Sequence, residues 1–276
     1  MPPCPPGTIV RRYVDAGGLR LHLAQCGADD APPLLLLHQT PRSWTEYRAV
    51  LPRLGQRRRA IALDTPGFGA SDPVPGEPGI EAWAAAAAAL LDALHIDRAD
   101  VVGHHTGGVI ALELAAARPA LVGRLVLSST PWIDAAEQQR RATRPPIDLV
   151  QPRADGSHLL ELWQRRAPFY PAQRPELLQA FVQDALTVLG HVEQGHAVVT
   201  RYRMDLRIGA VTQPTLVLRA ARDPFAAPHA ATLAAHLPHA RLVSIADGMV
   251  PLPEQLPDAF CDAIEAFLDE RQVRGC

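Results

Sequence analysis

Residues 101–108 read VVGHHTGG and follow the pattern G-x-S-x-G, with His105 in the place of the serine. In that pattern a sharp turn between a strand and a helix exposes a hydroxyl, which a histidine and an aspartate from later in the chain activate. Here Val101 and Val102 lead into the turn, and a helical pattern follows at residues 109–118. An imidazole at the centre of the turn cannot form the usual acyl-enzyme, so this replacement decides which chemistry is available.

Outward from this turn, strand and helix patterns alternate along the chain. A hairpin is predicted first, with strands at residues 8–14 and 19–25 joined through two glycines. Short apolar runs then predict strands at residues 34–37, 60–63, 124–128, 215–219 and 241–245. Helical patterns cover residues 44–54, 80–95, 109–118 and 259–271, the first of them opened by SWTE, a capping box at residues 43–46. This alternation predicts an α/β fold with a mostly parallel central sheet flanked by helices.

The alternation stops in one long segment. Between residues 132 and 210 there are helical patches, such as 159–166 and 175–189, but no apolar strand run. We therefore expect an α/β core over residues 1–131, an inserted helical lid over residues 132–210, and the rest of the core over residues 211–276. The aromatic side chains of the lid should mostly pack it onto the core and in part line a cavity. An enclosed cavity favours a mid-sized, partly apolar substrate with a polar or anionic group.

The composition excludes several classes of function. The chain has 276 residues, of which 47% are hydrophobic, and a formal net charge of -2. We therefore expect a soluble globular protein that binds a small-molecule substrate, with no nucleic-acid partner and no membrane partner. The chain contains no lysine, so it cannot form a Schiff base or supply the lysine of a phosphate-binding P-loop. We expect no cofactor, and no run approaches the roughly 18 apolar residues of a membrane span.

The cysteines and the first residues bear on location. Cys4, Cys26, Cys261 and Cys276 are scattered and show no C-x-x-C spacing. Residues 1–6, MPPCPP, lack the charged start and apolar stretch of a secretory signal. Both observations favour a cytoplasmic location. The sequence leaves the oligomeric state open.

Four stretches in order resemble the α/β-hydrolase superfamily, in particular its lid-bearing members of the epoxide-hydrolase and C–C-hydrolase kind. The resemblance implies an α/β-hydrolase fold, and it covers nearly the whole chain. Its landmarks are the following: LLLLHQTP at residues 34–41 looks like a strand and H-G-x-P loop, DTPGFGAS at 64–71 like the D-x-P-G-x-G-x-S turn, residues 101–108 like the nucleophile elbow, and LVLRAARDP at 216–224 like the strand and loop of the catalytic acid. The catalytic acid of the family would then be Asp223.

The usual catalytic histidine of the family is missing. It stands in a pattern like G-H-x-x-P-E-x-P-x-x-F, whereas residues 248–260 read GMVPLPEQLPDAF. Aligned on the prolines, its position falls on Val250; aligned on the glycine, it falls on Met249. Neither side chain can transfer a proton, so both the nucleophile and the base of the usual triad are absent.

Three interpretations of this pattern remain open. In the one we favour, the ring of His105 projects into the volume that Val250 leaves free, and its distal nitrogen approaches Asp223. The pair would act as a general base whose tautomer the carboxylate fixes, with no covalent nucleophile. In the second, His105 is only a turn residue of a decayed enzyme, since histidine tolerates positive φ better than most residues. In the third, His38, His104 and His105 bind a metal, but adjacent side chains point apart and no carboxylate has ligand spacing, so we expect no metal.

The resemblance also implies an oxyanion hole formed by the backbone N–H groups of Thr40 and Thr106. Such donors stabilise a developing oxyanion whether or not an acyl-enzyme forms. The lid histidines His158, His191 and His196 lie in polar helical surroundings, and we expect them to stay away from the substrate.

Five further residues are candidates for binding the substrate: Gln39, Arg42, His38, Met249 and Val250. Gln39 replaces a glycine of the family's loop and places an amide at the mouth of the site, unless it faces solvent. Arg42 could pair with a substrate carboxylate, although a solvated role is also open. His38 belongs to the framework of the same loop and also has a structural interpretation.

These features favour a cofactor-free enzyme that acts on a small carbonyl compound by general-base and oxyanion catalysis, such as a lyase, cyclase or isomerase. Two alternatives stay open. One is a hydrolase of an ester, lactone or epoxide in which His105 activates water. The other is a catalytically inactive protein that only binds a ligand.

Overall fold

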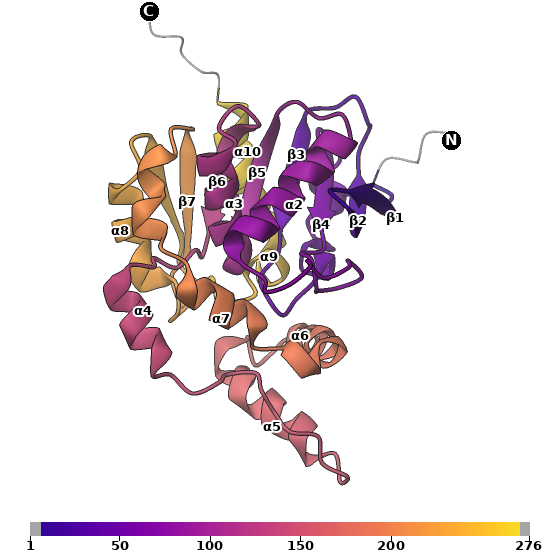
Figure 1. The fold of residues 1–276 in the computed structure, drawn as a ribbon, viewed down its shortest axis with the longest axis vertical. Helices are drawn as coiled ribbons and strands as arrows, with labels where there is room; N and C mark the ends of the chain where they lie inside the picture. Colours follow the sequence, from indigo (N-terminus) through magenta and orange to yellow (C-terminus); the bar gives the residue numbers. More distant parts are fainter. Residues whose placement is uncertain (1–6, 271–276) are drawn as a thin grey trace, which may run out of the picture.

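One eight-stranded sheet organises the molecule, in the order β1-β2-β4-β3-β5-β6-β7-β8 (Figure 1). The computed structural model describes residues 7–270. The strands pair in parallel, except that β2 lies antiparallel to both β1 and β4. Their bounds are β1 Val10–Ala16, β2 Leu19–Cys26, β3 Pro33–Leu37, β4 Arg59–Leu63, β5 Ala99–His104, β6 Val122–Ser128, β7 Thr215–Ala220 and β8 Ala240–Ile245. The prediction of a mostly parallel central sheet is confirmed.

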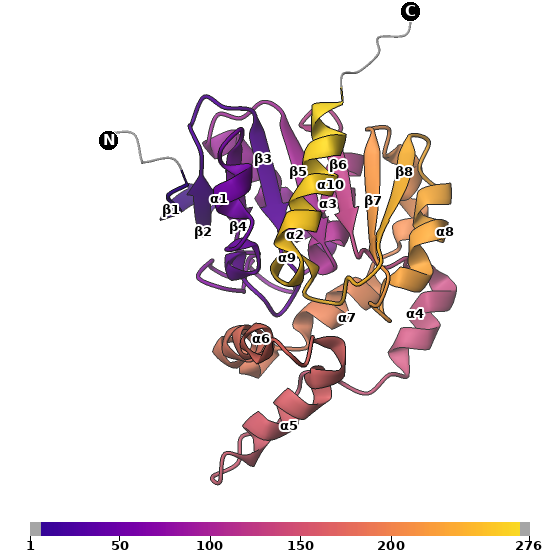
Figure 2. The same ribbon diagram turned by 180° about the vertical axis from the view of Figure 1, so that it is seen from behind.

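Helices cover both faces of the sheet. One face carries α2 (Ile80–Ala93), α3 (Thr106–Ala117) and α8 (Ala230–Ala235), and the other carries α1 (Leu51–Leu54), α9 (Leu252–Gln255) and α10 (Pro257–Asp269) (Figures 1 and 2). The apolar run of β3 explains this arrangement. Leu35 and Leu37 join the core on the first face, while Leu34 and Leu36 join the core on the second, because successive side chains of a strand point to opposite faces.

The helix predicted over residues 44–54 is wrong as a single element. The chain forms the 3-10 helix η1 (Trp44–Tyr47) and the short helix α1 instead, with Pro52 in the first turn of α1. Ser43 does accept a hydrogen bond from the Thr45 N–H, but Glu46 does not complete the predicted capping box. Its carboxylate turns toward the loop after β3 instead.

The segment between β6 and β7 is helical, and we refer to residues 132–210 as the inserted segment. Its helices are α4 (Ala135–Ala142), α5 (Ser157–Arg166), α6 (Pro175–Thr187) and α7 (Gln194–Arg201), with short 3-10 turns between them. They gather at one end of the sheet, and α5 projects furthest from it (Figures 1 and 2). The segments α5 and α6 share a small apolar cluster, whereas Val198 and Val199 of α7 join the core of the sheet.

Some expectations lie beyond the described residues. Cys4, Cys276, the start at residues 1–6 and the predicted helix end at Arg271 all fall outside residues 7–270. Within the described residues, no helix combines the length and the apolar character that crossing a membrane requires.

Candidate active site

The turn at His105 has the strained geometry that its sequence pattern predicts. His105 lies between β5 and α3 with φ 48° and ψ -115°, a region that L-residues rarely adopt. The backbone is so tightly packed that a Cβ on Gly107 would lie 1.9 Å from the Leu37 carbonyl oxygen. A Cβ on Gly103 would lie 2.2 Å from the carbonyl oxygen of Gly107. The two glycines therefore let strand, turn and helix approach closely, with His105 at the apex.

His105 contacts the carboxylate of Asp223. The distance from His105 Nε2 to Asp223 Oδ2 is 2.8 Å, although the ring N–H does not point in line with the oxygen as in an ideal hydrogen bond. Asp223 is fully buried in the loop after β7, and its Oδ1 accepts the backbone N–H of Phe225. Burial alone would raise the pKa of Asp223, but His105 and this N–H outweigh it and lower the pKa below its usual value. The carboxylate is therefore ionised at neutral pH.

The second nitrogen of the His105 ring remains available. Nδ1 makes no hydrogen bond within residues 7–270, and it is not among their buried unpaired atoms. The neighbouring ring of His104 lies edge-on to the His105 ring, with the two ring centroids 4.7 Å apart. His104 has both nitrogens engaged, one with the Ser128 hydroxyl and one with the carbonyl oxygen of Val250. Burial, with His105 nearby, lowers the pKa of His104 to about 3, so this ring is neutral.

The two threonines expected at the oxyanion hole meet beside His105. The side-chain oxygens of Thr40 and Thr106 lie 3.0 Å apart. Helix α3 begins at Thr106, so its N–H is one of the first-turn donors without an intrahelical acceptor. The Thr40 N–H likewise donates to no backbone or side-chain group in the described part of the chain. Both donors are thus available at the same end of the sheet.

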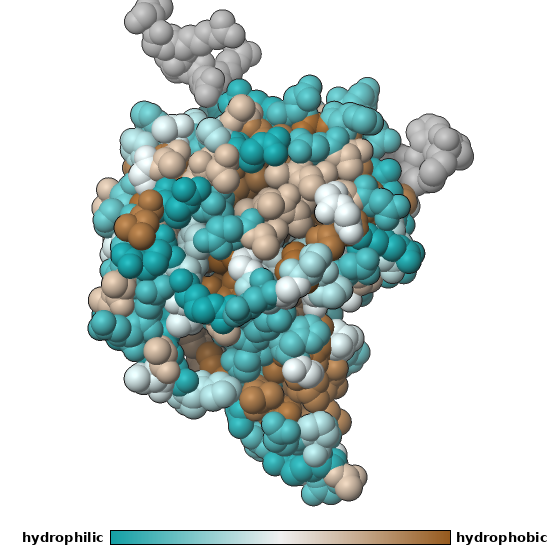
Figure 3. Space-filling model, viewed as in Figure 1, coloured by the Kyte–Doolittle hydropathy of each residue, from teal (hydrophilic) through white to brown (hydrophobic). Residues whose placement is uncertain are grey.

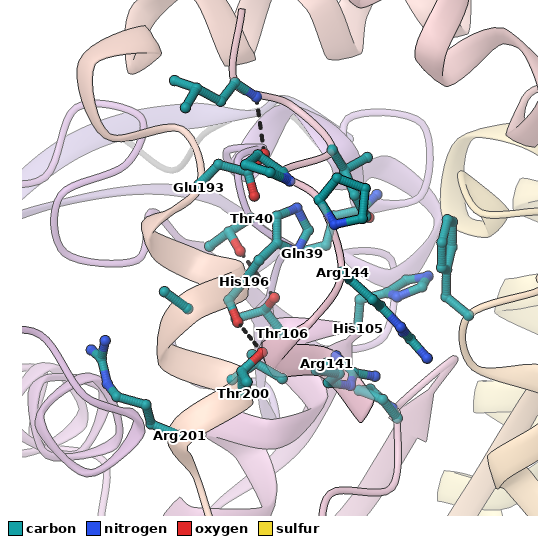
Figure 4. Close-up of a pocket in the computed structure, with 18 of the residues that line it drawn as sticks. Gln39, Thr40, His105, Thr106, Arg141, Arg144, Glu193, His196, Thr200 and Arg201 are labelled. Atoms are coloured by element: carbon teal, nitrogen blue, oxygen red, sulfur yellow. Dashed lines mark hydrogen bonds between the residues drawn. The ribbon is translucent and has the colours of Figure 1, made fainter. Parts of the chain in front are cut away.

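A cavity of about 440 Å³ opens in front of these groups (Figure 4). In the space-filling view the surface is recessed between the sheet and the inserted segment, with apolar residues inside a hydrophilic rim (Figure 3). The core contributes one wall and the inserted segment the other. The wall of the core is lined by Gln39, Thr40, His105, Thr106, Pro131, Phe225 and Val250. The inserted segment lines the cavity mainly with α4, the loop after it and α7.

Gln39 lines the cavity, and Glu46 holds it there. Gln39 donates its backbone N–H to Glu46 Oε2 at 2.9 Å and its side-chain amide to Glu46 Oε1 at 2.6 Å. The amide oxygen of Gln39 is left as an acceptor. Burial raises the pKa of Glu46 to about 8. The sequence contained this residue only as the last position of a supposed capping box, so its partner could not be predicted.

Arg42, His38 and Met249 do not line the cavity, which corrects their assignment as substrate-binding residues. Arg42 is fully buried, since its guanidinium donates two hydrogen bonds to Glu254 and one to Asp184. The His38 ring accepts the Thr65 N–H and donates to the carbonyl oxygen of Gln39, as its framework interpretation implies. Met249 lies beside the cavity residue Val250 without reaching the lining. Within residues 7–270 no group of three metal-ligating side chains forms, around these histidines or elsewhere.

One histidine of the inserted segment reaches the cavity, contrary to expectation. His196 of α7 lines it, and its Nε2 lies 2.9 Å from Asp148 Oδ2 (Figure 4). Sequence reasoning missed this residue because Asp148 precedes it by 48 positions, in a loop without a recognisable pattern. Arginines of the same segment also line the cavity, namely Arg141, Arg144, Arg166 and Arg201.

The fold and this site together define the α/β-hydrolase class: a mostly parallel sheet, a strained strand-to-helix turn, and a buried aspartate facing its apex. The chain belongs to the alpha/beta hydrolase fold family, whose model matches residues 32–249. The resemblance inferred from the sequence is thereby confirmed. The matched range includes the turn at residue 105, but the match assigns no role to the histidine there.

Several relatives and solved structures with similar sequence or fold are named as hydrolases. The chain is 40% identical over 122 residues to 2-hydroxy-6-oxo-2,4-heptadienoate hydrolase of Pseudomonas putida, which covers 43% of this chain and 44% of that protein. It is 30% identical over 122 residues to epoxide hydrolase 1 of Caenorhabditis elegans, covering 44% of this chain and 30% of that protein. Each match thus spans less than half of the relative. The enol-lactonase of Burkholderia xenovorans LB400 is similar in fold, with 22% identity, a TM-score of 0.78, and coverage of 94% of this chain and 100% of that one.

Proposed function

We propose that the protein hydrolyses a small ester or lactone by direct attack of a water molecule that His105 activates. The sequence alone favoured a lyase, cyclase or isomerase. The relatives named above are hydrolases, and they support the hydrolase alternative better than that first interpretation. The choice of an ester or lactone follows from the oxyanion donors, which suit a carbonyl group.

The observation that carries this proposal is the 2.8 Å contact between His105 Nε2 and Asp223 Oδ2 at the wall of the cavity. A buried carboxylate beside Nε2 favours the tautomer with the proton on Nε2. The lone pair is then on Nδ1, which makes no hydrogen bond within residues 7–270 and is not among their buried unpaired atoms. The ring is therefore arranged as a neutral general base rather than as a nucleophile.

Hydrolysis then proceeds in two steps. His105 Nδ1 takes a proton from water while the water oxygen attacks the carbonyl carbon, and the electron pair of the C=O bond moves to its oxygen. The N–H groups of Thr40 and Thr106 stabilise that oxyanion. Collapse of the tetrahedral intermediate breaks the bond to the leaving oxygen, which keeps the electron pair and takes up one proton, so that an acid and an alcohol form. His105 gives up the proton that it took from water and returns to its neutral state. No bond between substrate and protein forms at any point.

The charge of the inserted segment favours a substrate with a carboxylate. Arg140, Arg141 and Arg144 all contact the one carboxylate of Glu137. Two of them, Arg141 and Arg144, also line the cavity. Three guanidinium groups on one carboxylate leave a net positive charge at the cavity wall, and arginine binds carboxylates through paired hydrogen bonds. We therefore propose an anionic ester or lactone as the substrate class.

The test is turnover of a panel of carboxylate-bearing esters and lactones in ¹⁸O-labelled water, with rapid quenching for intact protein mass. We expect labelled oxygen in the acid product and no acylated protein, and we expect the His105→Ala variant to lose turnover. An acyl adduct on the wild-type protein would contradict direct water attack. Full turnover in His105→Ala would exclude the base, and binding without turnover across the panel would favour the ligand-binding alternative.

A further inference from the structure

The cavity contains a second histidine–aspartate pair, on the wall that the inserted segment contributes. His196 belongs to α7 and lines the cavity together with His105 (Figure 4). Its Nε2 lies 2.9 Å from Asp148 Oδ2, and Asp148 is fully buried. The arrangement repeats the contact of His105 with Asp223, in which the same ring nitrogen faces a buried carboxylate at 2.8 Å.

The surroundings of Asp148 fix its charge and the orientation of the ring. Arg166 donates hydrogen bonds to both carboxylate oxygens of Asp148, and the backbone N–H of Asp148 is bound by Glu193. Burial opposes ionisation, but Arg166 and His196 lower the pKa of Asp148 to about 2. The carboxylate is therefore charged at neutral pH and accepts the Nε2–H of His196 at 2.9 Å, while the Arg166 guanidinium also lies 3.3 Å from the same Nε2. Nδ1 of His196 makes no hydrogen bond within residues 7–270, which leaves it free for the cavity.

Close packing places Gly195, the residue before His196, against Thr40. A Cβ on Gly195, the preceding residue, would lie 1.8 Å from Thr40 Oγ1, so the backbone of α7 rests directly on Thr40. Thr40 Oγ1 in turn lies 3.0 Å from Thr106 Oγ1, beside His105. The residues adjacent to His196 and to His105 are thus linked through Thr40 by two direct contacts.

From this geometry we propose that His196, oriented by Asp148, is the general acid that protonates the leaving oxygen. The inference rests on the proposed hydrolysis. His196 starts as the imidazolium. As the tetrahedral intermediate collapses, the carbon–oxygen bond breaks and its electron pair goes to the leaving oxygen, which takes the Nδ1 proton of His196. His105 then holds the proton from water, His196 is neutral, and proton exchange with solvent restores both rings.

Leaving-group dependence tests this role. We would compare an ethyl ester with a p-nitrophenyl ester of the same acid, since only the ethyl ester needs a protonated leaving oxygen. His196→Gln should lower kcat for the ethyl ester about 100-fold or more and for the p-nitrophenyl ester less than about threefold. Asp148→Asn should show the same selectivity with a smaller loss. The matched control is His158→Gln on α5, a histidine outside the cavity, which should change neither rate.

The outcomes separate this proposal from the proposed function. His105→Ala should lose both esters equally, because activation of water precedes either leaving group. Equal loss of both esters in His196→Gln would overturn the acid role, as would no loss at all. Should His196→Gln fail to fold, the wild-type pH profile decides. With His196 as the acid, kcat for the ethyl ester falls at alkaline pH, while kcat for the p-nitrophenyl ester does not. Parallel pH profiles for the two esters would overturn the acid role of His196. A wild-type protein that hydrolyses no ester and no lactone of the panel overturns both proposals.

Discussion

The two walls of the cavity carry the same pair of residues in different settings. On the wall of the core, His105 faces Asp223; on the wall of the inserted segment, His196 faces Asp148. Both carboxylates are fully buried, but the side chain of His105 is 13% exposed and that of His196 is 31% exposed. The first pair is fixed by strand ends and a turn with positive φ, whereas the second depends on how a short helix docks. The sheet therefore fixes the positions of His105 and Asp223, whereas the positions of His196 and Asp148 depend on how the inserted segment docks.

Buried polar contacts hold the inserted segment in place. Arg42, in the loop after β3, contacts Asp184 of α6 at 2.8 Å. The carboxylate of Glu113 in α3 accepts hydrogen bonds from Tyr202 and Arg207 at the other end of the segment. Arg42 does not line the cavity, but its contact with Asp184 ties the second wall to the first. Such contacts make docking specific, which an acid on the second wall needs.

The largest expected effect falls on the first wall. Asp223→Asn should lower kcat/KM by about 10³-fold, nearly as much as His105→Ala, because an amide no longer fixes the ring tautomer or balances the charge of the protonated base. The amide of this variant keeps an oxygen for the Phe225 N–H, so the fold should persist. Steady-state kinetics on the best ester of the panel measures the loss of activity, and thermal unfolding of the same variant checks that the fold persists. An Asp223→Asn variant with wild-type kcat/KM would show that the contact between His105 and Asp223 has no part in catalysis.

The next effect tests the docking of the second wall. Gly195→Ala puts a methyl group into the side chain of Thr40, so α7 must move away. A displacement of about 1 Å can cost roughly 10²-fold in rate, and we expect a loss of that order in kcat with most of the stability retained. Gly190→Ala is the matched control, because a Cβ there meets nothing within 4 Å and its φ is not in the positive region. If both variants keep full activity, the second wall has no part in turnover.

The same contrast explains what the sequence could predict. The core was predictable because buried parallel strands are short apolar runs and the landmark motifs stand at their ends. The contact of His105 with Asp223 followed from side-chain length and from the volume that Val250 leaves free. By contrast, Arg42 meets Asp184 and Glu254, which lie 142 and 212 positions away, so nothing local marks it as buried. His196 was misjudged for the same reason, because its partner comes from an irregular loop.

A third prediction concerns the stability of the second wall. Asp148 has a pKa of about 2 in the folded protein and an ordinary value of 3.8. A lowered pKa adds to the free energy of unfolding above pH ~4, here by about 2 kcal/mol, and this contribution is lost as pH falls toward 2. About 1 kcal/mol of it is already lost at pH 3. The side chain of Asp148→Asn does not ionise, so the variant lacks this pH-dependent contribution to stability. Urea unfolding should therefore show a stability gap between wild type and variant that narrows by about 1 kcal/mol from pH 6 to pH 3.

The control for this measurement is Asp30→Asn, at an exposed side chain without an ion pair in residues 7–270. Its free energy of unfolding should stay within about 0.5 kcal/mol of the wild-type value at both pH values. A gap for Asp148→Asn that is constant with pH would mean that Asp148 ionises as in an unfolded chain. The contact with Arg166 would then not hold the second wall together.

The smallest effect concerns the charge on the second wall rather than its position. Arg144 is the most weakly held of the three arginines on Glu137, at 3.4 Å against 2.8 Å for Arg140 and Arg141, and it lines the cavity. It is therefore the guanidinium most available to a substrate carboxylate.

Arg144→Gln should raise KM for an anionic ester about tenfold, the equivalent of roughly 1.4 kcal/mol, with little change in kcat. Arg140→Gln removes the same charge from the same carboxylate outside the cavity lining, so it should leave KM within about twofold. A neutral ester should not distinguish the variants. If Arg140→Gln raises KM as much as Arg144→Gln does, the field of the cluster attracts the substrate without any one arginine binding it, and the second wall contributes charge but no carboxylate site.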